Sequence, residues 1–267
     1  MKLTAKQHSA ASKALFTAER TGTQIPSISA TYPKSDVEDA YAIAQGVTAL
    51  KVKDGNVVQG HKIGLTSKAM REMSQAKEPD YGTLTDDYFV LEGATVPSDR
   101  LHRALVEVEI AFVLKHDLNG PNVNIAQVIQ ATDFILPCLE IVDSRQSSRG
   151  PTPLVDTVAD AASCGFVVLG GCPRRLTDVD IRRIGATLFI NGEAEVSGVS
   201  AAVMGNPINS VAWLANKLHS YGVPLLAGQV LLSGSFVRAI PFGPGDTLTA
   251  LFDQLGEVQL SVAKAPA

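Results

Sequence analysis

The first fifty or so residues carry apolar positions at helical spacing. In SDVEDAYAIAQGVTALKVKDG, apolar residues return every three or four positions from Val37 to Val47, as they do on one face of a helix. Ser35 with Glu38 fits a capping box at the start, and an Asp-Gly pair at the end fits a stop. The pattern predicts a helix over this stretch.

From Val57 onward the pattern changes to short runs rich in Val, Ile, Leu and Phe, separated by Gly, Pro and Asn-Gly, which is typical of strands and tight turns. The candidate strands are VVQGHKIG, VEVEIAFVL, DFILPCLEIV, CGFVVLG, ATLFI, QVLLSGSF and DTLTALF. In TLFINGEAEV, Asn191-Gly192 lies between two alternating runs and predicts a two-residue hairpin turn. NPINSVAWLANKLHSYG predicts one more helix, with Asn206 as N-cap, Pro207 as the first helical residue and Gly222 as the stop.

These elements predict an α+β protein that is mostly β. We expect an N-terminal helical region over residues 1–72 and a β domain over residues 73–267. The boundary rests only on the change from helical to strand pattern, so one continuous domain also fits. With 267 residues, either arrangement can bury a substantial core.

The composition favours a small-molecule partner. The formal charge is −4, the pI is near 5.7, and Lys and Arg are scattered, so no basic patch favours nucleic acid or an anionic membrane. The start lacks the apolar core of a secretory signal, and no window approaches the roughly 18 apolar residues of a membrane span. A cytoplasmic protein is expected. Cys138, Cys164 and Cys172 form no Cys-x-x-Cys pair, which argues against a disulfide framework or a structural zinc site.

Two carboxylates lie inside an otherwise apolar run, ALVEVEIAFVLK, at positions 104–115. Strand side chains alternate faces, so Glu107 and Glu109 share one face, about 6 to 7 Å apart. Ala111 and Val113 continue that face, so it does not look solvated. An unpaired ionised carboxylate there would cost on the order of several kcal/mol. The alternative is an edge strand whose acidic face meets water or arginines.

A third acid, Glu140, lies in a similarly apolar run, FILPCLEIV. Three buried carboxylates, with no His in either run, point to a hard dication, Mg²⁺ or Mn²⁺, because zinc sites usually recruit nitrogen or sulfur. We therefore predict that Glu107, Glu109 and Glu140 bind a divalent metal and leave coordination positions for water and a chelating substrate.

Other catalytic patterns are missing from the sequence. It has no Gly-x-Ser-x-Gly elbow, His-Glu-x-x-His, phosphate-binding Gly-rich loop or dinucleotide fingerprint. The five histidines are dispersed and mostly flanked by polar residues. Each is expected to be a surface or hydrogen-bonded histidine.

An ordered set of motifs resembles a known family. The motifs are HKIGLTSKAM at 61–70, EPDYG at 78–82, VEVEIAFVL at 106–114, LEIVDSR at 139–145 and GSFVRAIPFGPGDT at 234–247. They are similar to the 2-hydroxy-2,4-dienoate hydratases and 4-oxalocrotonate decarboxylases of aromatic meta-cleavage pathways, within the fumarylacetoacetate hydrolase superfamily. The resemblance runs from about residue 35 to 262 and is strongest to the branch that hydrates 2-oxohept-4-ene-1,7-dioate. It implies a mixed β-sandwich or roll core, an N-terminal helical region and a homo-oligomer.

The resemblance also implies roles for single residues. Glu107, Glu109 and Glu140 match the family's divalent-metal ligands, and Lys62 and Asp80 match pocket residues suited to proton transfer. The candidate substrate-binding residues are Leu65, Tyr81, Ser163, Ser235 and Arg238. For the two serines the alternative is a turn or strand hydroxyl that bonds to the backbone. Apart from the resemblance, Arg71 or Arg238 could pair with a distal carboxylate of the substrate; the alternative is a surface cation, since arginine is mostly exposed.

One segment departs from the family pattern. Relatives usually carry Asp-Asn in the segment that corresponds to VADAASCGF, whereas Asp160 is here followed by Ala161. Any contact that the asparagine amide makes in relatives must be replaced or lost.

The implied reaction is metal-dependent hydration of a 2-hydroxy-2,4-dienoate, or its 2-oxoalkenoate tautomer, to a 4-hydroxy-2-oxo acid. Candidate substrates are 2-hydroxypenta-2,4-dienoate and 2-oxohept-4-ene-1,7-dioate. Decarboxylation of 2-oxohex-3-enedioate is the alternative, because it would use the same enolate stabilisation. A hypothesis of another class is that the protein is a catalytically silent partner of a neighbouring pathway enzyme. However, binding to a partner would not by itself require three buried carboxylates.

Overall fold

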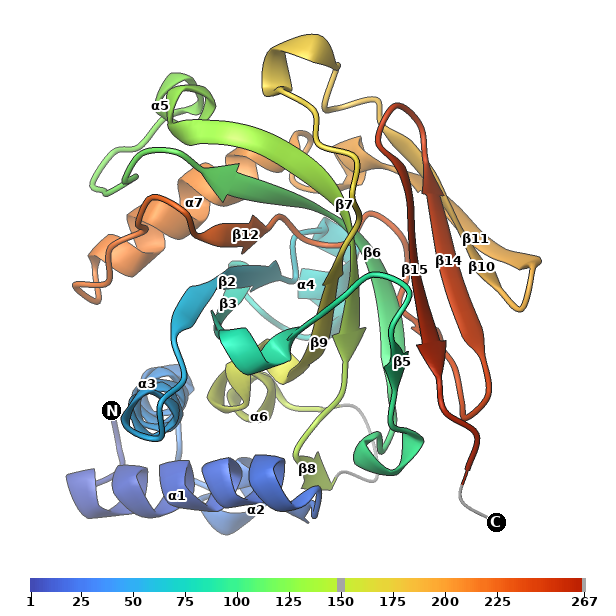
Figure 1. The fold of residues 1–267 in the computed structure, drawn as a ribbon. Coiled ribbons are helices and arrows are strands. Elements are labelled where there is room, and N and C mark those ends of the chain that lie inside the picture. The colour runs from blue at the N-terminus through green and yellow to red at the C-terminus, as the bar shows by residue number, and fades with distance from the viewer. Residues whose placement is uncertain (148–151, 266–267) are drawn as a thin grey trace.

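A curled sheet forms the centre of the computed structural model, which describes residues 1–147 and 152–265 (Figure 1). Within that part of the chain the sheet has eight strands, in the order β3-β2-β12-β6-β7-β9-β4, with β13 paired to β6. The strands are β2 Val58–Gly64, β3 Asp80–Thr85, β4 Phe89–Val90, β6 Leu105–Leu114, β7 Thr132–Val142, β9 Cys164–Leu169, β12 Val230–Leu232 and β13 Ile240–Pro241.

A second, five-stranded sheet lies beside it and completes the β part of the fold (Figure 1). Its order is β11-β10-β14-β15-β5, from β5 Thr95–Val96, β10 Gly185–Ile190, β11 Glu193–Val199, β14 Thr247–Phe252 and β15 Gly256–Val262; β1 Ile25–Pro26 and β8 Gln146–Ser147 pair separately. The predicted hairpin turn is confirmed. Asn191 and Gly192 join β10 to β11 with φ of 54° and 84°, as a type I′ turn requires.

The helices cover the outside of the curled sheet, with α1 and α3 packed together near the N-terminus (Figure 1). They are α1 Ala5–Thr21, α2 Ile28–Thr31, α3 Val37–Lys53, α4 Lys68–Met73, α5 Ile125–Ala131, α6 Leu154–Ala159 and α7 Pro207–His219. None of the described helices is long and apolar enough to cross a membrane. The architecture is α+β, as predicted.

Both predicted helices form, with one difference at a cap. Asn206 caps α7 and Pro207 is its first residue, as expected. The cap of α3 is Asp36 with Asp39, one residue after the predicted Ser35 and Glu38. The buried Asp39 carboxylate also accepts hydrogen bonds from the amides of residues 2 and 3 and pairs with His8, so tertiary contacts fix where the helix begins.

The predicted boundary after residue 72 falls between β2 and β3, which are hydrogen-bonded neighbours. One hydrophobic core contains buried residues from both sides of it, from Ala11 to Val262. The N-terminal helices and the β elements therefore share a core.

The two faces of β6 lie in different surroundings, as its alternation predicts. Val106, Val108, Ile110 and Phe112 belong to the large outer core. Ala111 packs on the opposite face in a small cluster drawn from the strands of the same sheet, with Cys138 and Cys164 among its members. That face is the inside of the curl, and Glu107 and Glu109 point into it.

Candidate metal centre and active site

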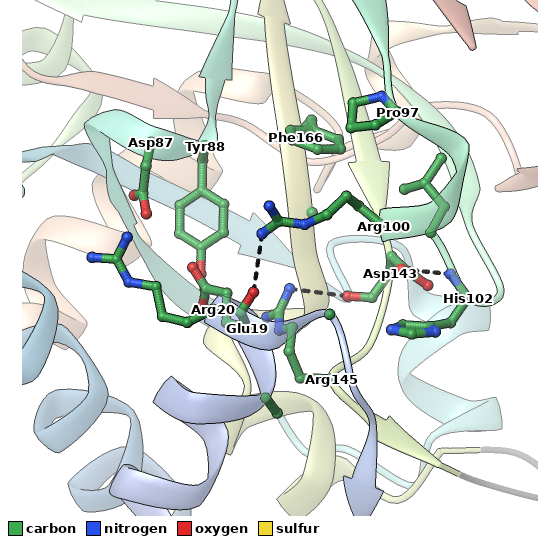
Figure 2. Close-up of a pocket in the computed structure, with 14 residues that line it drawn as sticks. Glu19, Arg20, Asp87, Tyr88, Pro97, Arg100, His102, Asp143, Arg145 and Phe166 are labelled. Atoms are coloured by element: carbon green, nitrogen blue, oxygen red, sulfur yellow. Dashed lines mark hydrogen bonds between the residues drawn. The ribbon is translucent and has the colours of Figure 1, made fainter. Parts of the chain in front are cut away.

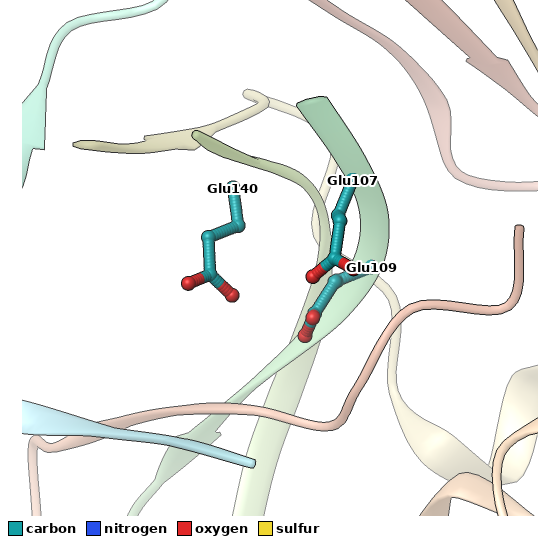
Figure 3. A group of neighbouring side chains, drawn as sticks. All are labelled: Glu107, Glu109 and Glu140. Atoms are coloured by element: carbon teal, nitrogen blue, oxygen red, sulfur yellow. The ribbon is translucent and has the colours of Figure 1, made fainter. Parts of the chain in front are cut away.

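Three carboxylates converge inside the curled sheet. Glu107 and Glu109 lie two residues apart on β6, and Glu140 of β7 is the cross-strand partner of Glu107. One oxygen from each lies within 4.8 Å of the others. Figure 3 shows the three side chains turned toward one another. The predicted trio therefore meets in space.

Burial and mutual repulsion make these groups reluctant to ionise. Burial, with repulsion from Glu140 and Asp80, raises the pKa of Glu107 to about 7, although Lys62 opposes the shift. Burial, with repulsion from Glu140 and Glu107, also raises the pKa of Glu109 well above its ordinary value. The Gly234 amide donates a 2.8 Å hydrogen bond to Glu109 Oε2 and keeps one oxygen oriented.

The donor set and its charge fit a divalent metal. Among residues 1–147 and 152–265, Lys62 is the only cation that forms an ion pair with the trio. When all four groups are charged, two negative charges are left without compensation in a buried site, which is costly. Oxygen donors without nitrogen or sulfur suit Mg²⁺ or Mn²⁺. Glu107, Glu109 and Glu140 could therefore hold such an ion.

Lys62 links the trio to the neighbouring chain. It lies on β2, and its Nζ is 2.8 Å from Glu140 Oε1. Nζ also donates a 2.8 Å hydrogen bond to the carbonyl oxygen of Ala162. Burial alone would lower the pKa of Lys62, but the carboxylates of Glu140 and Glu107 outweigh it and raise the pKa. The ammonium is held charged and in place.

Asp80 is the first residue of β3, directly opposite Gly64 of β2. A Cβ at position 64 would lie 2.2 Å from Asp80 Oδ1, so only glycine leaves room for this carboxyl. Neither Asp80 oxygen accepts a hydrogen bond of good geometry, although the Gly64 amide is near enough to lower the pKa slightly. Burial dominates and raises the pKa to about 6. Asp80 is thus suited to exchange a proton near neutral pH.

A cavity of about 560 Å³ opens beside these groups. It is lined by Lys62, Asp80 and Glu107, and by four of the predicted substrate-binding residues: Leu65, Ser163, Ser235 and Arg238. Glu109 and Glu140 are fully buried and are not part of its wall. The structure therefore brings seven of the ten predicted site residues to one cavity, with two more directly behind Glu107.

The lining residues differ in what they offer a ligand. The Ser235 hydroxyl is already bonded to the backbone, donating to the Val237 carbonyl at 2.9 Å. Leu65 adopts a left-handed φ of 55° in the loop after β2. Arg238 is exposed and forms no ion pair with any described residue, so its guanidinium is available to a ligand.

Two of the candidate substrate-binding residues, Tyr81 and Arg71, lie outside the cavity. Tyr81 points to the other face of β3, where its ring stacks on Tyr41 with centroids 4.5 Å apart. Arg71 donates hydrogen bonds to the Leu65 and Thr66 carbonyls at 2.9 and 2.8 Å. Arg71 therefore supports the loop that carries Leu65 and does not face the ligand space.

One histidine, His61, is buried and is hydrogen-bonded through one ring nitrogen only, because its Nδ1 lies 3.4 Å from Thr83 Oγ1. His61 is fully buried on the face of β2 opposite Lys62, and its Nε2 has no hydrogen-bond partner. Burial lowers its pKa to about 4, so it is neutral at physiological pH. Its polar neighbours in sequence gave no sign of burial, because β2 is sandwiched between other strands and the helices.

The comparisons with known proteins agree with this geometry. The family profile described as "Fumarylacetoacetate (FAA) hydrolase C-terminal" matches residues 48–263. The chain belongs to the fumarylacetoacetate hydrolase family.

Individual relatives cover nearly the whole chain. The 2-oxo-hept-4-ene-1,7-dioate hydratase of Escherichia coli is 43% identical over 256 residues, which are 94% of this chain and 96% of that protein. The 4-oxalocrotonate decarboxylase of Pseudomonas sp. (strain CF600) is 38% identical over 234 residues, 88% of each chain. The solved structure of 4-oxalocrotonate decarboxylase from Pseudomonas putida G7, complexed with magnesium and adipate, superposes with a TM-score of 0.94 at 34% identity, covering 98% of this chain and 99% of that one. The resemblance to the hydratase and decarboxylase branch of the fumarylacetoacetate hydrolase family is confirmed.

Proposed function

We propose that this protein is a divalent-metal-dependent hydratase that converts a 2-hydroxy-2,4-dienoate, or its 2-oxoalkenoate tautomer, to a 4-hydroxy-2-oxo acid in the meta-cleavage catabolism of aromatic compounds. The observation that carries the proposal is the meeting of the three carboxylates, Lys62 and Asp80 at one cavity. The 43% identity to a named hydratase over 94% of the chain supports the choice of reaction. The candidate substrates are 2-oxohept-4-ene-1,7-dioate and 2-hydroxypenta-2,4-dienoate.

Glu107, Glu109 and Glu140 would hold Mg²⁺ or Mn²⁺, consistent with the oxygen-only donor set. The ion would supply Lewis acidity, which stabilises the negative charge that develops on the 2-oxygen of the substrate, next to its 1-carboxylate. Because Glu107 lines the cavity and Glu109 and Glu140 lie behind it, the reacting end of the substrate would point toward Glu107.

Lys62 and Asp80 are our candidates for the proton transfers. The dienol first loses the proton of its 2-hydroxyl and gains one at C5, which gives the 2-oxo-3-enoate. Water then adds its hydroxyl to C4 and a proton to C3. The Asp80 carboxyl, with a pKa near 6, can hold and release protons in both steps. The Lys62 ammonium is placed to neutralise charge on the 2-oxygen.

Arg238 is our candidate for recognising the distal end of the substrate. Lys62 and Arg238 are the only cations among the described residues that line the cavity, and Lys62 already pairs with Glu140. A diacid such as 2-oxohept-4-ene-1,7-dioate would present its second carboxylate to Arg238. Ser163 and Leu65 would contact the chain between the two ends.

Decarboxylation of 2-oxohex-3-enedioate is the second candidate, because a named 4-oxalocrotonate decarboxylase is 38% identical over 88% of this chain, and the solved structure of another has the same fold. The same residues would stabilise the enolate that forms when carbon dioxide leaves. A homo-oligomer is also proposed, on family grounds, and sedimentation velocity would test it.

One assay separates the candidates. The enzyme with Mg²⁺ is offered 2-hydroxypenta-2,4-dienoate and 2-oxohex-3-enedioate separately, and loss of the dienol and release of carbon dioxide are followed. We expect hydration of the dienoate. Carbon dioxide release without hydration would establish the decarboxylase instead. A silent partner subunit would do neither, and its metal affinity would survive Glu107→Ala.

A further inference from the structure

Three consecutive residues beside the active site adopt the left-handed conformation. Ala161, Ala162 and Ser163 have φ of 49°, 50° and 59°. Residues other than glycine, asparagine and aspartate rarely adopt this conformation, because Cβ crowds the following carbonyl. Successive left-handed residues persist only where surrounding contacts determine them.

The turn delivers a carbonyl to Lys62. Ala162 O accepts the 2.8 Å hydrogen bond from Lys62 Nζ, and Glu140 lies on the other side of the same ammonium. The turn also rests directly on β3. A Cβ at Gly82, the cross-strand partner of Lys62, would lie 2.1 Å from Ala161 O. Glycine at 82 therefore permits the approach that brings Ala162 to Lys62.

Arg145 holds both ends of the turn. Its Nε and Nη2 donate to Asp160 Oδ1 and Asp160 O, each at 2.6 Å, and Nη1 donates to Cys164 O. Nη1 also donates to the Asp143 carbonyl at 3.1 Å, the bond drawn in Figure 2. Arg145 is only 8% exposed and Asp160 only 4%. The guanidinium thus binds four acceptors: two on Asp160, just before the strained segment, one on Cys164, just after it, and one on Asp143.

Arg145 does not reach the catalytic cavity. It lines a separate cavity of about 310 Å³, where Arg100 and Phe166 are its neighbours (Figure 2). Its hydrogen bonds to Asp160 and Cys164 connect it to the catalytic cavity through the turn. A lysine could not replace it, because a single ammonium cannot present the flat, forked set of donors that these acceptors require.

We propose that Arg145, with Asp160, is a positioning residue that holds the left-handed turn so that the Ala162 carbonyl fixes the Lys62 ammonium beside Glu140. The effect on turnover rests on the proposed function, whereas the effect on Lys62 does not.

Two variants test the inference by different routes, with Arg100→Lys as the matched control in the cavity of Figure 2. Arg145→Lys removes the fork but keeps the charge. Gly82→Ala leaves Arg145 intact and pushes the turn away from β3. If Arg145→Lys fails to fold, Asp160→Asn replaces it, because it removes the charge that pairs with Arg145 and keeps the size of the side chain.

The first readout needs no activity. In protein with ¹⁵N-labelled lysine and no metal, the Lys62 ammonium should give a protected NMR signal, assigned by its absence in Lys62→Met. We expect both variants to lose or shift that signal and Arg100→Lys to keep it. An unchanged signal in Arg145→Lys, or in its replacement, overturns the role of Arg145, and an unchanged signal in Gly82→Ala overturns the role of the turn.

The second readout is steady-state kinetics with Mg²⁺. We expect kcat to fall about 10- to 100-fold in both variants, as small misplacements of a reacting group do, with KM and Mg²⁺ affinity unchanged. A wild-type kcat in both variants would contradict the positioning role. A loss of kcat that is accompanied by a loss of Mg²⁺ affinity and of folded protein would also contradict it. If the wild type turns over neither substrate while the Lys62 signal still responds, the proposed function fails and the positioning role stands.

Discussion

Glu107 of β6 and Glu140 of β7 are directly opposed partners in an antiparallel strand pair. Like charges at such positions destabilise a sheet, and here both face the inside of the curl with Glu109 beside them. Lys62 compensates one of the charges. The sheet therefore carries an electrostatic cost that a bound dication would relieve, and most of the predictions below follow from that cost.

Removing one charge from the trio should stabilise the metal-free protein and abolish its response to metal. Glu109→Gln keeps an oxygen for the Gly234 amide but removes one of the repelling charges. For the wild type, Mg²⁺ at about 100 times its Kd should add about 2.7 kcal/mol of stability, and for the variant none. Thermal unfolding with EDTA and with Mg²⁺ checks this. The exposed Glu195→Gln on β11 is the control and should behave as wild type.

The stability of the metal-free protein should depend on pH in a direction set by the raised pKa values. In the unfolded chain Glu107 loses its proton near pH 4.5, but in the folded protein only near 7. Between these pH values the folded state binds more protons than the unfolded state. The contribution of Glu107 to the free energy of unfolding therefore falls as pH rises through this window. Asp80, with a pKa near 6, acts in the same direction.

Buried His61 opposes this trend, because its lowered pKa makes stability rise with pH between about 4 and 6.5. The difference between wild type and Glu107→Gln isolates the carboxylate. Denaturant titrations from acid to neutral pH should show that the free energy of unfolding of Glu107→Gln increases relative to that of the wild type as pH rises toward 7. A difference that does not change with pH would mean that Glu107 ionises as freely folded as unfolded.

Asp80→Asn should separate proton transfer from metal binding. The variant keeps the size of the side chain but cannot exchange a proton, so kcat should fall by about 10²- to 10⁴-fold. Mg²⁺ affinity should stay at the wild-type value, because Asp80 is not one of the three converging carboxylates. Deuterium incorporation into the product in D₂O, followed by NMR, measures the step directly. Wild-type exchange in the variant would remove Asp80 from the mechanism.

Arg238→Ala should change substrate preference and not the chemistry. An ion pair with a distal carboxylate is worth about 1.5–3 kcal/mol, or about 10- to 100-fold in kcat/KM. We expect that loss for 2-oxohept-4-ene-1,7-dioate, and wild-type kinetics for 2-hydroxypenta-2,4-dienoate, which has no second carboxylate. Equal losses on both substrates would show that Arg238 acts on the loop and not on the diacid.

The metal site could be predicted from the sequence because two of its three carboxylates lie on one strand. Period-two alternation in β6 places Glu107 and Glu109 on one face, and Glu140 in a second apolar run completes the set. The hairpin at Asn191-Gly192 and the cap of α7 were predicted for a similar reason, since each depends on a few neighbouring residues.

The remaining parts of the site depend on contacts between distant segments. The Pro79-Asp80 pair is typical of a turn, but Asp80 is the first residue of β3 because it pairs with Gly64 of β2. With β3 recognised as a strand, alternation would have placed Tyr81 on the face opposite Asp80, where it lies. The Ala162 carbonyl and the left-handed turn have no side-chain pattern at all. In the sequence, Arg145 is recognisable only as a cation that follows Glu140 and Asp143.

Calorimetric titration of Mg²⁺ into EDTA-stripped protein tests the metal centre most directly, at about pH 7.5, above the raised pKa of Glu107. Wild-type protein should bind a single ion per chain, and Glu140→Gln should bind at least about 100-fold more weakly, since losing one of three anionic ligands removes several kcal/mol. Equal affinity in the two proteins, or no binding by the wild type, would contradict a metal held by Glu107, Glu109 and Glu140.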